Sequence, residues 1–212
     1  MMEKGTVYFF TGLAGAGKTT IGGLFYQKLR ERKSNVFLAD GDQTRSIFGR
    51  SGYSTEARKD AARRGFRLWR ELAEQGIDVV VCSIAMYDEI RAWNRENIEN
   101  YREIYIKVTR ETLYRRDQKG LYTTGRKEVV GVDLPYDEPR NSDVVVENNG
   151  EERPQEIVDR LPSIFSSRFS SIFSTGAWWT LAAEREHGCG WRRRWARRAF
   201  WDTTAIMCPG SC

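Results

Sequence analysis

The sequence predicts an α/β fold in which a parallel sheet lies between two layers of helices. Two observations lead to this prediction. Apolar runs typical of strands alternate along the chain with amphipathic patterns typical of helices. The run 77–82 is apolar at all but one position, as expected of a strand that is covered on both faces. Repeated β-α-β units of this kind imply right-handed crossovers between parallel strands.

Length and composition set the limits of the fold. The 212 residues leave room for one α/β domain, which we expect at 1–165, and an appended segment at 166–212. No run of 18 apolar residues predicts a membrane span, and the first residues lack the apolar core of a signal peptide. The four cysteines have no disulfide-framework spacing, which favours a reducing, cytoplasmic location.

The first predicted strand, at 7–10, leads into a glycine-rich segment with the sequence G-L-A-G-A-G-K-T. This segment satisfies the pattern G-x-x-x-x-G-K-[ST] at every position, and a helical pattern over about 18–33 follows it. A strand, a glycine-rich loop and a helix in this order predict a P-loop NTPase-type fold. The residues expected to bind a nucleoside triphosphate are Gly12, Leu13, Ala14, Gly15, Ala16, Gly17, Lys18, Thr19 and Thr20.

The chemistry of this segment, called here the phosphate loop (Gly12–Thr19), follows from its residue types. Its glycines allow successive backbone N–H groups to point inward and surround phosphate oxygens. The start of the following helix adds the positive end of its dipole. Lys18 is expected to reach the β- and γ-phosphates of ATP, and the Thr19 hydroxyl to hold Mg²⁺. A glycine-rich turn with a merely solvated lysine is the alternative, which the flanking strand and helix disfavour.

The remaining elements are predicted in order along the chain. Ser54 is expected to cap the long helix, Gly76 to end it, and Pro154 to begin the last helix. The segment 117–139 contains three glycines and two prolines and is expected to be a loop. The predicted strands and helices are 35–39 (strand), 54–75 (helix), 77–82 (strand), 88–99 (helix), 104–108 (strand), a short helix through 113, 143–147 (strand) and 154–165 (helix).

Two carboxylates follow the second predicted strand. Asp40 and Asp42 stand at its carboxyl end, the edge at which open α/β sheets bind their ligands, and we expect this strand to lie beside the phosphate loop. A carboxylate there can accept the proton of an attacking hydroxyl or hold Mg²⁺ through water. A solvated Asp-Gly-Asp turn is the alternative. The sequence leaves open which aspartate is the base, and we favour the pair acting together with Lys18 as the catalytic group.

Several motifs together resemble the adenylyl-sulfate kinases. They are the phosphate loop with Thr20, D-G-D-Q-T-R at 40–45, G-Y-S at 52–54, R-D-Q-K-G-L-Y at 116–122 and G-V-D-L-P-Y at 131–136. The resemblance covers about 5–165. That family uses MgATP to phosphorylate the 3′-hydroxyl of adenylyl sulfate, a step of sulfate assimilation. The resemblance implies a small-molecule nucleotide acceptor, a homodimer, and no DNA, RNA or membrane partner for the core.

The resemblance also assigns roles to individual residues. Arg45 and Arg58 match arginines that hold the phosphosulfate group, for which a forked guanidinium is suited. Tyr53 stands where the family has an aromatic residue that stacks on the substrate base. Arg116, with Lys119 and Tyr122, matches a mobile lid that closes over the nucleotides. The residues expected around the acceptor are Asp42, Arg45, Tyr53, Arg58, Ile84, Ala85, Lys119, Gly120 and Leu121, while Arg116 is expected at the ATP.

The acceptor side departs from the family pattern. Ala61 stands where the family has a substrate-reading asparagine, and 85–88 reads A-M-Y-D where S-P-Y-R is common. The segment after Tyr122 is also about five residues shorter than usual. The version over 85–95 is similar to a subgroup found with capsule gene sets, at least one branch of which phosphorylates cytidine diphosphoramidate. That acceptor is therefore the alternative to adenylyl sulfate.

The segment 166–212 has a different character. It holds five of the seven tryptophans, and the part from 161 onward carries four of the five net positive charges. Interleaved Trp and Arg at 191–198 are typical of single-stranded nucleic-acid or membrane-surface binding, and His187 with three cysteines offers zinc ligands. A weakened nucleotide-binding protein that recruits such a partner is the alternative of another class. We favour a poorly ordered segment, such as a shifted reading frame would produce.

Overall fold

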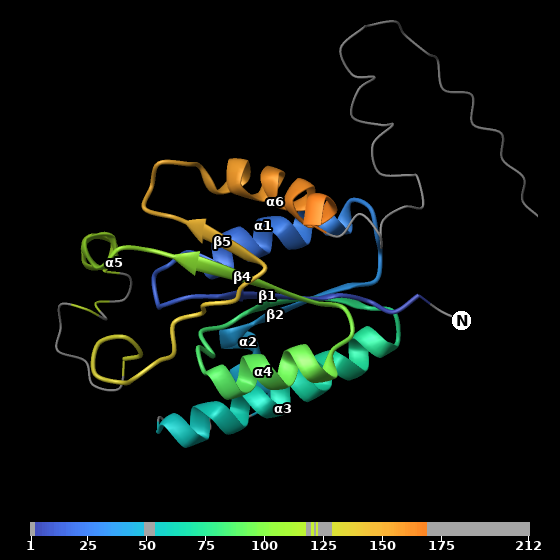
Figure 1. Cartoon of the computed structure of the whole chain (residues 1–212), viewed down its shortest axis with the longest axis horizontal. Helices are drawn as coiled ribbons and strands as arrows, with labels where there is room; N and C mark the ends of the chain where they lie inside the picture. Colours follow the sequence, from blue (N-terminus) through green and yellow to red (C-terminus); the bar gives the residue numbers. More distant parts are fainter. Residues whose placement is uncertain (1–2, 49–53, 118–119, 121, 123–128, 169–212) are drawn as a thin grey trace, which may run out of the picture. The chain divides into compact units, whose positions relative to one another are not determined.

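Parallel strands form a single sheet in the computed structural model, which describes residues 3–48, 54–117, 120, 122 and 129–168 (Figure 1). In chain order the elements are β1 (Val7–Thr11), α1 (Lys18–Arg30), β2 (Val36–Asp40), α2 (Gly41–Phe48), α3 (Thr55–Glu74), β3 (Asp78–Cys82), α4 (Asp88–Asn97), β4 (Tyr101–Lys107), α5 (Arg110–Arg116), β5 (Val144–Glu147) and α6 (Pro154–Arg168). The α/β prediction is confirmed.

The strand order is β2-β3-β1-β4-β5, and every neighbouring pair is parallel. In register, Phe9 of β1 is paired with Val81 of β3, which is in turn paired with Ala39 of β2. The strand that carries Asp40 is therefore one strand removed from β1, rather than directly beside it as the sequence suggested. All five strands still end at the same edge of the sheet, so Asp40 and the phosphate loop share that edge.

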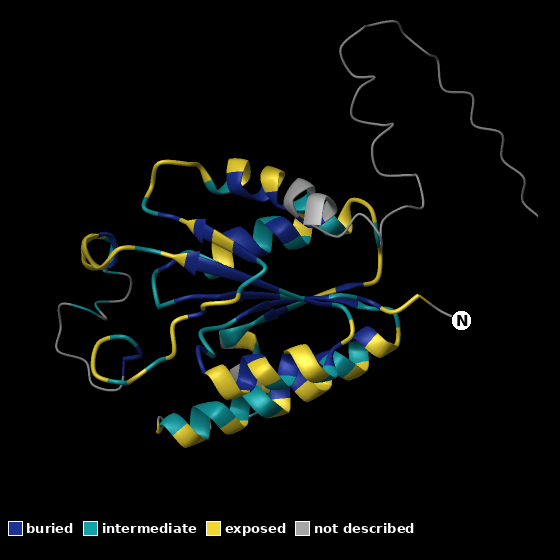
Figure 2. Cartoon of the chain, in the orientation of Figure 1, coloured by how far each residue is buried: buried dark blue, intermediate teal, exposed yellow. Residues whose placement is uncertain are grey.

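Helices cover both faces of the sheet, α1 and α6 on one and α3 and α4 on the other (Figure 1). The alternation along the strands explains this arrangement, since Phe10 faces the α1 side and Phe9 the α3 side. Each of these fully buried rings contributes about 2–3 kcal/mol of hydrophobic stabilisation. The strands at the middle of the sheet are buried accordingly (Figure 2), and β3 is buried at every residue.

Most predicted elements occur within a few residues of their expected bounds, and the Ser54 cap is confirmed because its hydroxyl accepts the N–H of Ala57 at 3.3 Å. Two differences concern the site. Helix α2 was not predicted, since Gly41 and its flanking aspartates are typical of a turn. Strand β4 begins at Tyr101, three residues before its predicted start. The prediction began late because Arg102 and Glu103 interrupt the apolar pattern.

Among the helices of the described residues, none combines the length and the apolar character that crossing a bilayer requires.

Candidate functional site

The phosphate loop connects β1 to α1 at the carboxyl edge of the sheet. Gly12, Gly15 and Gly17 have φ values of 149°, 78° and 100°, a region that disfavours residues with a side chain. At Gly12 a Cβ atom would also come within 2.4 Å of the carbonyl oxygen of Ile106. The end of β4 therefore packs directly on the loop backbone. Helix α1 begins at Lys18, so the loop leads straight into a helix N-terminus, as predicted.

Four consecutive carbonyl groups of the loop accept hydrogen bonds from side chains of four different segments. The donors and acceptors are Lys18 Nζ to Leu13 O (2.8 Å), Tyr122 Oη to Ala14 O (2.7 Å), Arg116 Nη1 to Gly15 O (3.5 Å) and Asn148 Nδ2 to Ala16 O (2.8 Å). In a trans peptide the N–H points opposite to the preceding C=O. Holding the carbonyls of Leu13, Ala14 and Ala16 in this way directs the N–H groups of Ala14, Gly15 and Gly17 to the other side of the loop, where an anion can bind them. The Ala16 N–H instead donates within the loop, to the carbonyl of Leu13 at 3.1 Å.

Lys18 is half-buried at the start of α1. Burial lowers the pKa of its ammonium to about 8, while the negative charge of Asp40 acts in the opposite direction. Lys18 and Asp40, two of the three residues predicted to be catalytic, thus lie at the same edge of the sheet, with β3 between β1 and β2. The pKa of the neighbouring Cys82 thiol is raised to about 12, chiefly by burial, so this side chain remains a neutral thiol at neutral pH.

The lowered pKa of Lys18 predicts a pH dependence. In the free protein the ammonium is charged below about pH 8 and neutral above it. We therefore expect kcat/KM for ATP to fall as the pH rises through about 8, because the charge that binds phosphate is lost. The fall in kcat should come at higher pH, since bound triphosphate stabilises the ammonium. Initial rates between about pH 6 and 10 measure both profiles; a kcat/KM that stays level up to the usual lysine pKa would contradict the prediction.

The segment after β3 lies between the phosphate loop and the end of β2. The buried Thr11 hydroxyl donates a hydrogen bond of 2.5 Å to the carbonyl of Ile84, which ties this segment to the last residue of β1. Ala85 has φ 25°, a left-handed conformation that costs a residue with a side chain about 1–2 kcal/mol. Strain of this kind clusters at functional sites. Ile84 and Ala85, both predicted around the acceptor, follow β3 and so lie at the carboxyl edge of the sheet between the ends of β1 and β2.

Arg58 approaches the same segment from α3. Its positive charge and that of Lys59 act to lower the pKa of the Tyr87 hydroxyl, although burial, the larger influence, raises it. The Lys59 ammonium lies 5.6 Å from the centre of the Tyr87 ring. Arg58 is thus on the side of the edge that the sequence assigned to the acceptor.

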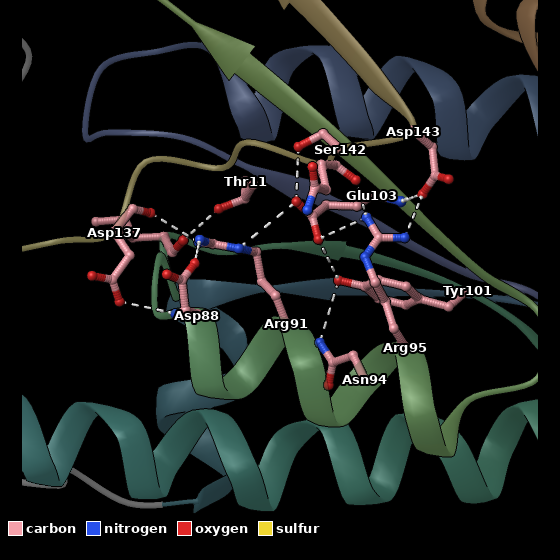
Figure 3. Close-up of polar contacts among 12 residues, drawn as sticks. Thr11, Asp88, Arg91, Asn94, Arg95, Tyr101, Glu103, Asp137, Ser142 and Asp143 are labelled. Carbon is pink, nitrogen blue, oxygen red and sulfur yellow. Dashed lines mark hydrogen bonds and ion pairs between the residues drawn. The ribbon is translucent and has the colours of Figure 1, made fainter.

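A buried polar network fixes the next loop onto α4 and β4 (Figure 3). Arg91 donates to the carbonyl of Asp137 at 2.9 Å and pairs with Asp88. Asp137 in turn accepts the N–H of Asp88 at 2.9 Å and donates its own N–H to the carbonyl of Met86 at 2.9 Å. The segment that carries G-V-D-L-P-Y-D is therefore attached to the residues that follow β3.

Glu103 is the acidic centre of this network and is 1% exposed. Its carboxylate accepts from Ser142 Oγ at 2.8 Å and lies 3.3 Å from Arg95 and 3.9 Å from Arg91 (Figure 3). The Tyr101 hydroxyl also donates to it at 3.3 Å. Burial first, and then this neighbouring carboxylate, raise the pKa of Tyr101 well above its usual value. Two arginines and two hydroxyls thus compensate one buried negative charge.

Neutralising this carboxylate is expected to destabilise the fold. Glu103→Gln keeps the shape but takes from the buried Arg91 and the more exposed Arg95 their shared counter-charge, at a cost of about 1–3 kcal/mol in the free energy of unfolding. Urea unfolding with an unchanged m-value measures this cost. Glu99→Gln is the matched control, because it removes an exposed pair with Lys4 and should cost less than about 1 kcal/mol. Equal losses for the two variants would contradict the prediction.

Several predicted residues cannot be placed by their side chains. Tyr53, Lys119, Leu121 and the segment 169–212, with its proposed zinc ligands, lie outside the described residues. The backbone of Asp42 and Arg45 belongs to α2, but their side chains are also outside the described part. Gly120 is described, and it donates its N–H to the carbonyl of Asp117 at 3.0 Å.

Thr19 is the residue that the sequence assigned to Mg²⁺. Thr19 is exposed in the first turn of α1, directly after the phosphate-loop lysine. Over the described residues, no group of three or more His, Cys, Asp or Glu side chains is placed to hold a metal ion. Mg²⁺ bound mainly by nucleotide phosphates needs only one or two protein oxygens, so Thr19 and Asp40 fit that ion chemically.

Asn148 was not predicted from the sequence. It follows β5, is 7% exposed, and reaches the phosphate loop from a distant part of the chain. Its position in the sequence could have identified it, since a polar Asn-Asn-Gly run directly after a predicted strand is expected at the ligand-binding edge of a parallel sheet.

Comparison with known proteins gives consistent matches. The sequence model of the adenylylsulphate kinase family matches residues 4–147. A cytidine diphosphoramidate kinase of Campylobacter jejuni is 42% identical over 76% of this chain and 99% of that protein. An adenylyl-sulfate kinase of a Picosynechococcus species is 35% identical over 74% of this chain and 92% of that protein.

A solved structure matches to a similar extent. The APS kinase of Mycobacterium tuberculosis, in complex with AMPPNP and APS, superimposes with a TM-score of 0.71 and 27% identity. The superposition covers 77% of this chain and 98% of that chain.

Proposed function

The chain belongs to the adenylylsulphate kinase family, and from that premise we propose that it transfers the γ-phosphoryl group of ATP to the 3′-hydroxyl of a nucleotide. Adenylyl sulfate is the first candidate acceptor. The observation that carries the proposal is the placement of Lys18 and Asp40 at the same carboxyl edge of the sheet, Lys18 directly after the phosphate loop and Asp40 at the end of β2. A phosphotransferase needs both groups within reach of one phosphoryl group.

In the proposed reaction the 3′-hydroxyl oxygen attacks the γ-phosphorus as the bond to the ADP oxygen breaks. The proton of the hydroxyl passes to the aspartate pair of Asp40 and Asp42. Lys18 and the N–H groups of the phosphate loop stabilise the charge that develops on the phosphoryl oxygens and on ADP. Mg²⁺, when bound, neutralises further phosphate charge, and Thr19 supplies a hydroxyl ligand for it.

The acceptor is proposed to bind between the phosphate loop and α3. Arg58, with Arg45, is assigned to its anionic group, and Ile84 and Ala85 to the wall beneath it. Because Thr11 fixes the carbonyl of Ile84, this wall has a defined distance from the donor loop. Positioning of this kind supplies much of the rate enhancement in phosphoryl transfer.

Cytidine diphosphoramidate is the second candidate acceptor. It is favoured by the 42% identity to the Campylobacter jejuni kinase and by the A-M-Y-D sequence at 85–88. Asp88 places a carboxylate, paired with Arg91, where a basic residue is common in adenylyl-sulfate kinases. The two candidates share donor and reaction type and differ in the base and in the terminal group of the acceptor.

A single assay separates the two candidates. The purified full chain is incubated with MgATP and either adenylyl sulfate or cytidine diphosphoramidate, and ADP release and the phosphorylated product are measured. The proposal expects 3′-phosphorylated adenylyl sulfate at a kcat/KM at least as high as that for the cytidine compound. Turnover of the cytidine compound alone would replace the first candidate by the second. ADP release with neither acceptor would reject both.

A further inference from the structure

The geometry points to Asn148 as a positioning residue that orients the phosphate loop for the triphosphate. This inference rests on the proposed binding of ATP at the loop, but it does not depend on which acceptor is used. Asn148 lies after β5, at the far end of the described sheet from β2. Neither the phosphate-loop pattern nor the segments predicted to close over the nucleotide include this residue.

The backbone of Asn148 is fixed before its side chain acts. Its N–H donates to the carbonyl of Lys107 at 2.9 Å, which extends the β4–β5 ladder by one residue beyond Glu147. The side chain, which is almost fully buried, then reaches across to donate from Nδ2 to the carbonyl of Ala16 at 2.8 Å. A buried amide held at both ends has little freedom to move, and losing its bond would leave a buried carbonyl unpaired.

This hydrogen bond acts on the peptide that joins Ala16 to Gly17. The C=O and N–H groups of a trans peptide are antiparallel, so fixing the Ala16 carbonyl on Asn148 directs the Gly17 N–H the opposite way. That direction is the side of the loop away from Asn148, where a phosphate oxygen can accept it. Asn148 thereby orients the last loop donor before Lys18 without itself contacting the nucleotide.

The close packing at this position supports a specific role. A Cβ atom on Gly17 would stand 2.6 Å from Nδ2 of Asn148, so the amide rests directly on the glycine. The φ of Gly17 is 100°, a value that glycine adopts without strain. The glycine of the motif is therefore required twice, once for its backbone conformation and once to admit this side chain.

The adjacent Asn149 connects the same turn to α5. Its Oδ1 accepts the N–H of Thr109 at 2.9 Å, directly before α5, and its carbonyl accepts from Arg115 at 3.2 Å. Helix α5 carries Arg116, which donates to the loop carbonyl of Gly15. Two neighbouring asparagines thus hold both the loop and the helix that contacts it.

Binding of MgATP and of magnesium tripolyphosphate to Asn148→Ala, measured by titration calorimetry with the full chain, tests the inference. We expect the Kd of both ligands to rise about tenfold, because both use the loop N–H groups. Asn148→Asp should bind more weakly still, since an isosteric carboxylate cannot donate to Ala16 and repels phosphate. The matched control is Asn97→Ala, which removes the same kind of bond, Nδ2 to the Trp93 carbonyl at 2.8 Å, and should bind within twofold of wild type.

Three results would overturn the inference. The first is an Asn148→Ala protein that binds tripolyphosphate as wild type does. The second is a loss of affinity confined to MgATP, which would assign the effect to the base. The third is an Asn148→Asp protein that binds either ligand more tightly than Asn148→Ala. If Asn148→Ala does not fold, Asn148→Ser, which retains a small donor, is compared with Asn148→Asp in the same titration, and equal affinities reject the role. The titration contains no acceptor, so it does not depend on kinase activity. If the wild-type protein binds MgATP but transfers no phosphoryl group, the proposed function is rejected and this test of Asn148 remains valid.

Discussion

Lys18→Ala is expected to lower kcat for phosphoryl transfer by about a thousandfold or more. The ammonium is the positively charged side chain that the phosphate loop carries at the carboxyl edge of the sheet, and the charge on the phosphoryl oxygens grows in the transition state. Within the loop it also bonds the carbonyl of Leu13, so its removal loosens the binding surface as well. Steady-state kinetics with saturating MgATP and the better acceptor measure the effect.

The control for this variant lies on the same helix. Lys28→Ala removes a lysine that pairs with Asp159 at 2.6 Å near the protein surface, away from the loop. Its activity should stay within twofold of wild type, and its unfolding free energy within about 1 kcal/mol. Transfer by Lys18→Ala at a rate near that of Lys28→Ala would remove the lysine from the mechanism.

Asp40→Asn is expected to lower kcat by about a hundred- to ten-thousandfold, with a smaller effect on KM for ATP. An amide can neither accept the proton of the acceptor hydroxyl nor supply a charged oxygen to Mg²⁺. The variant also removes a charge that acts to raise the pKa of Lys18. The fall of kcat/KM for ATP, expected near pH 8 in wild type, should therefore move to lower pH.

This pair of readouts separates two roles of Asp40. A lower kcat with a shifted pH profile supports a charge that acts on both Lys18 and the acceptor. A shifted profile with normal kcat would leave Asp42 as the base and limit Asp40 to electrostatics. Asp159→Asn, on the exposed face of α6, is the control and should alter neither property.

The conformation of the phosphate loop and its flanking elements was predictable because its information is local. Gly12–Thr19 carries a spacing that is meaningful by itself, and the strand before it and the helix after it are short-range patterns. The acceptor half was predictable only in part. Asp40 and Ile84 were expected at one edge, but the insertion of β3 between β1 and β2 is a matter of nonlocal pairing that periodicity does not encode.

The polar contacts that fix the site were beyond sequence reasoning for a related reason. Glu103 follows Arg102 in β4, a polar pair that indicates solvent exposure, whereas two arginines of α4 allow Glu103 to be buried. Asn148 stands 132 positions from the residue that it bonds. Such pairs become recognisable only when the fold brings the two segments together.

The strand order also sets a length. Neighbouring strands lie about 4.8 Å apart, so the ends of β1 and β2 are separated by about 10 Å, with the end of β3 between them. In the proposed in-line transfer, the leaving oxygen, the phosphorus and the attacking oxygen would occupy this interval, between the phosphate loop and Asp40. The spacing of the strands would then set the distance between the phosphate donor and the proposed base, and a substitution that shifted β3 would change that distance without touching either.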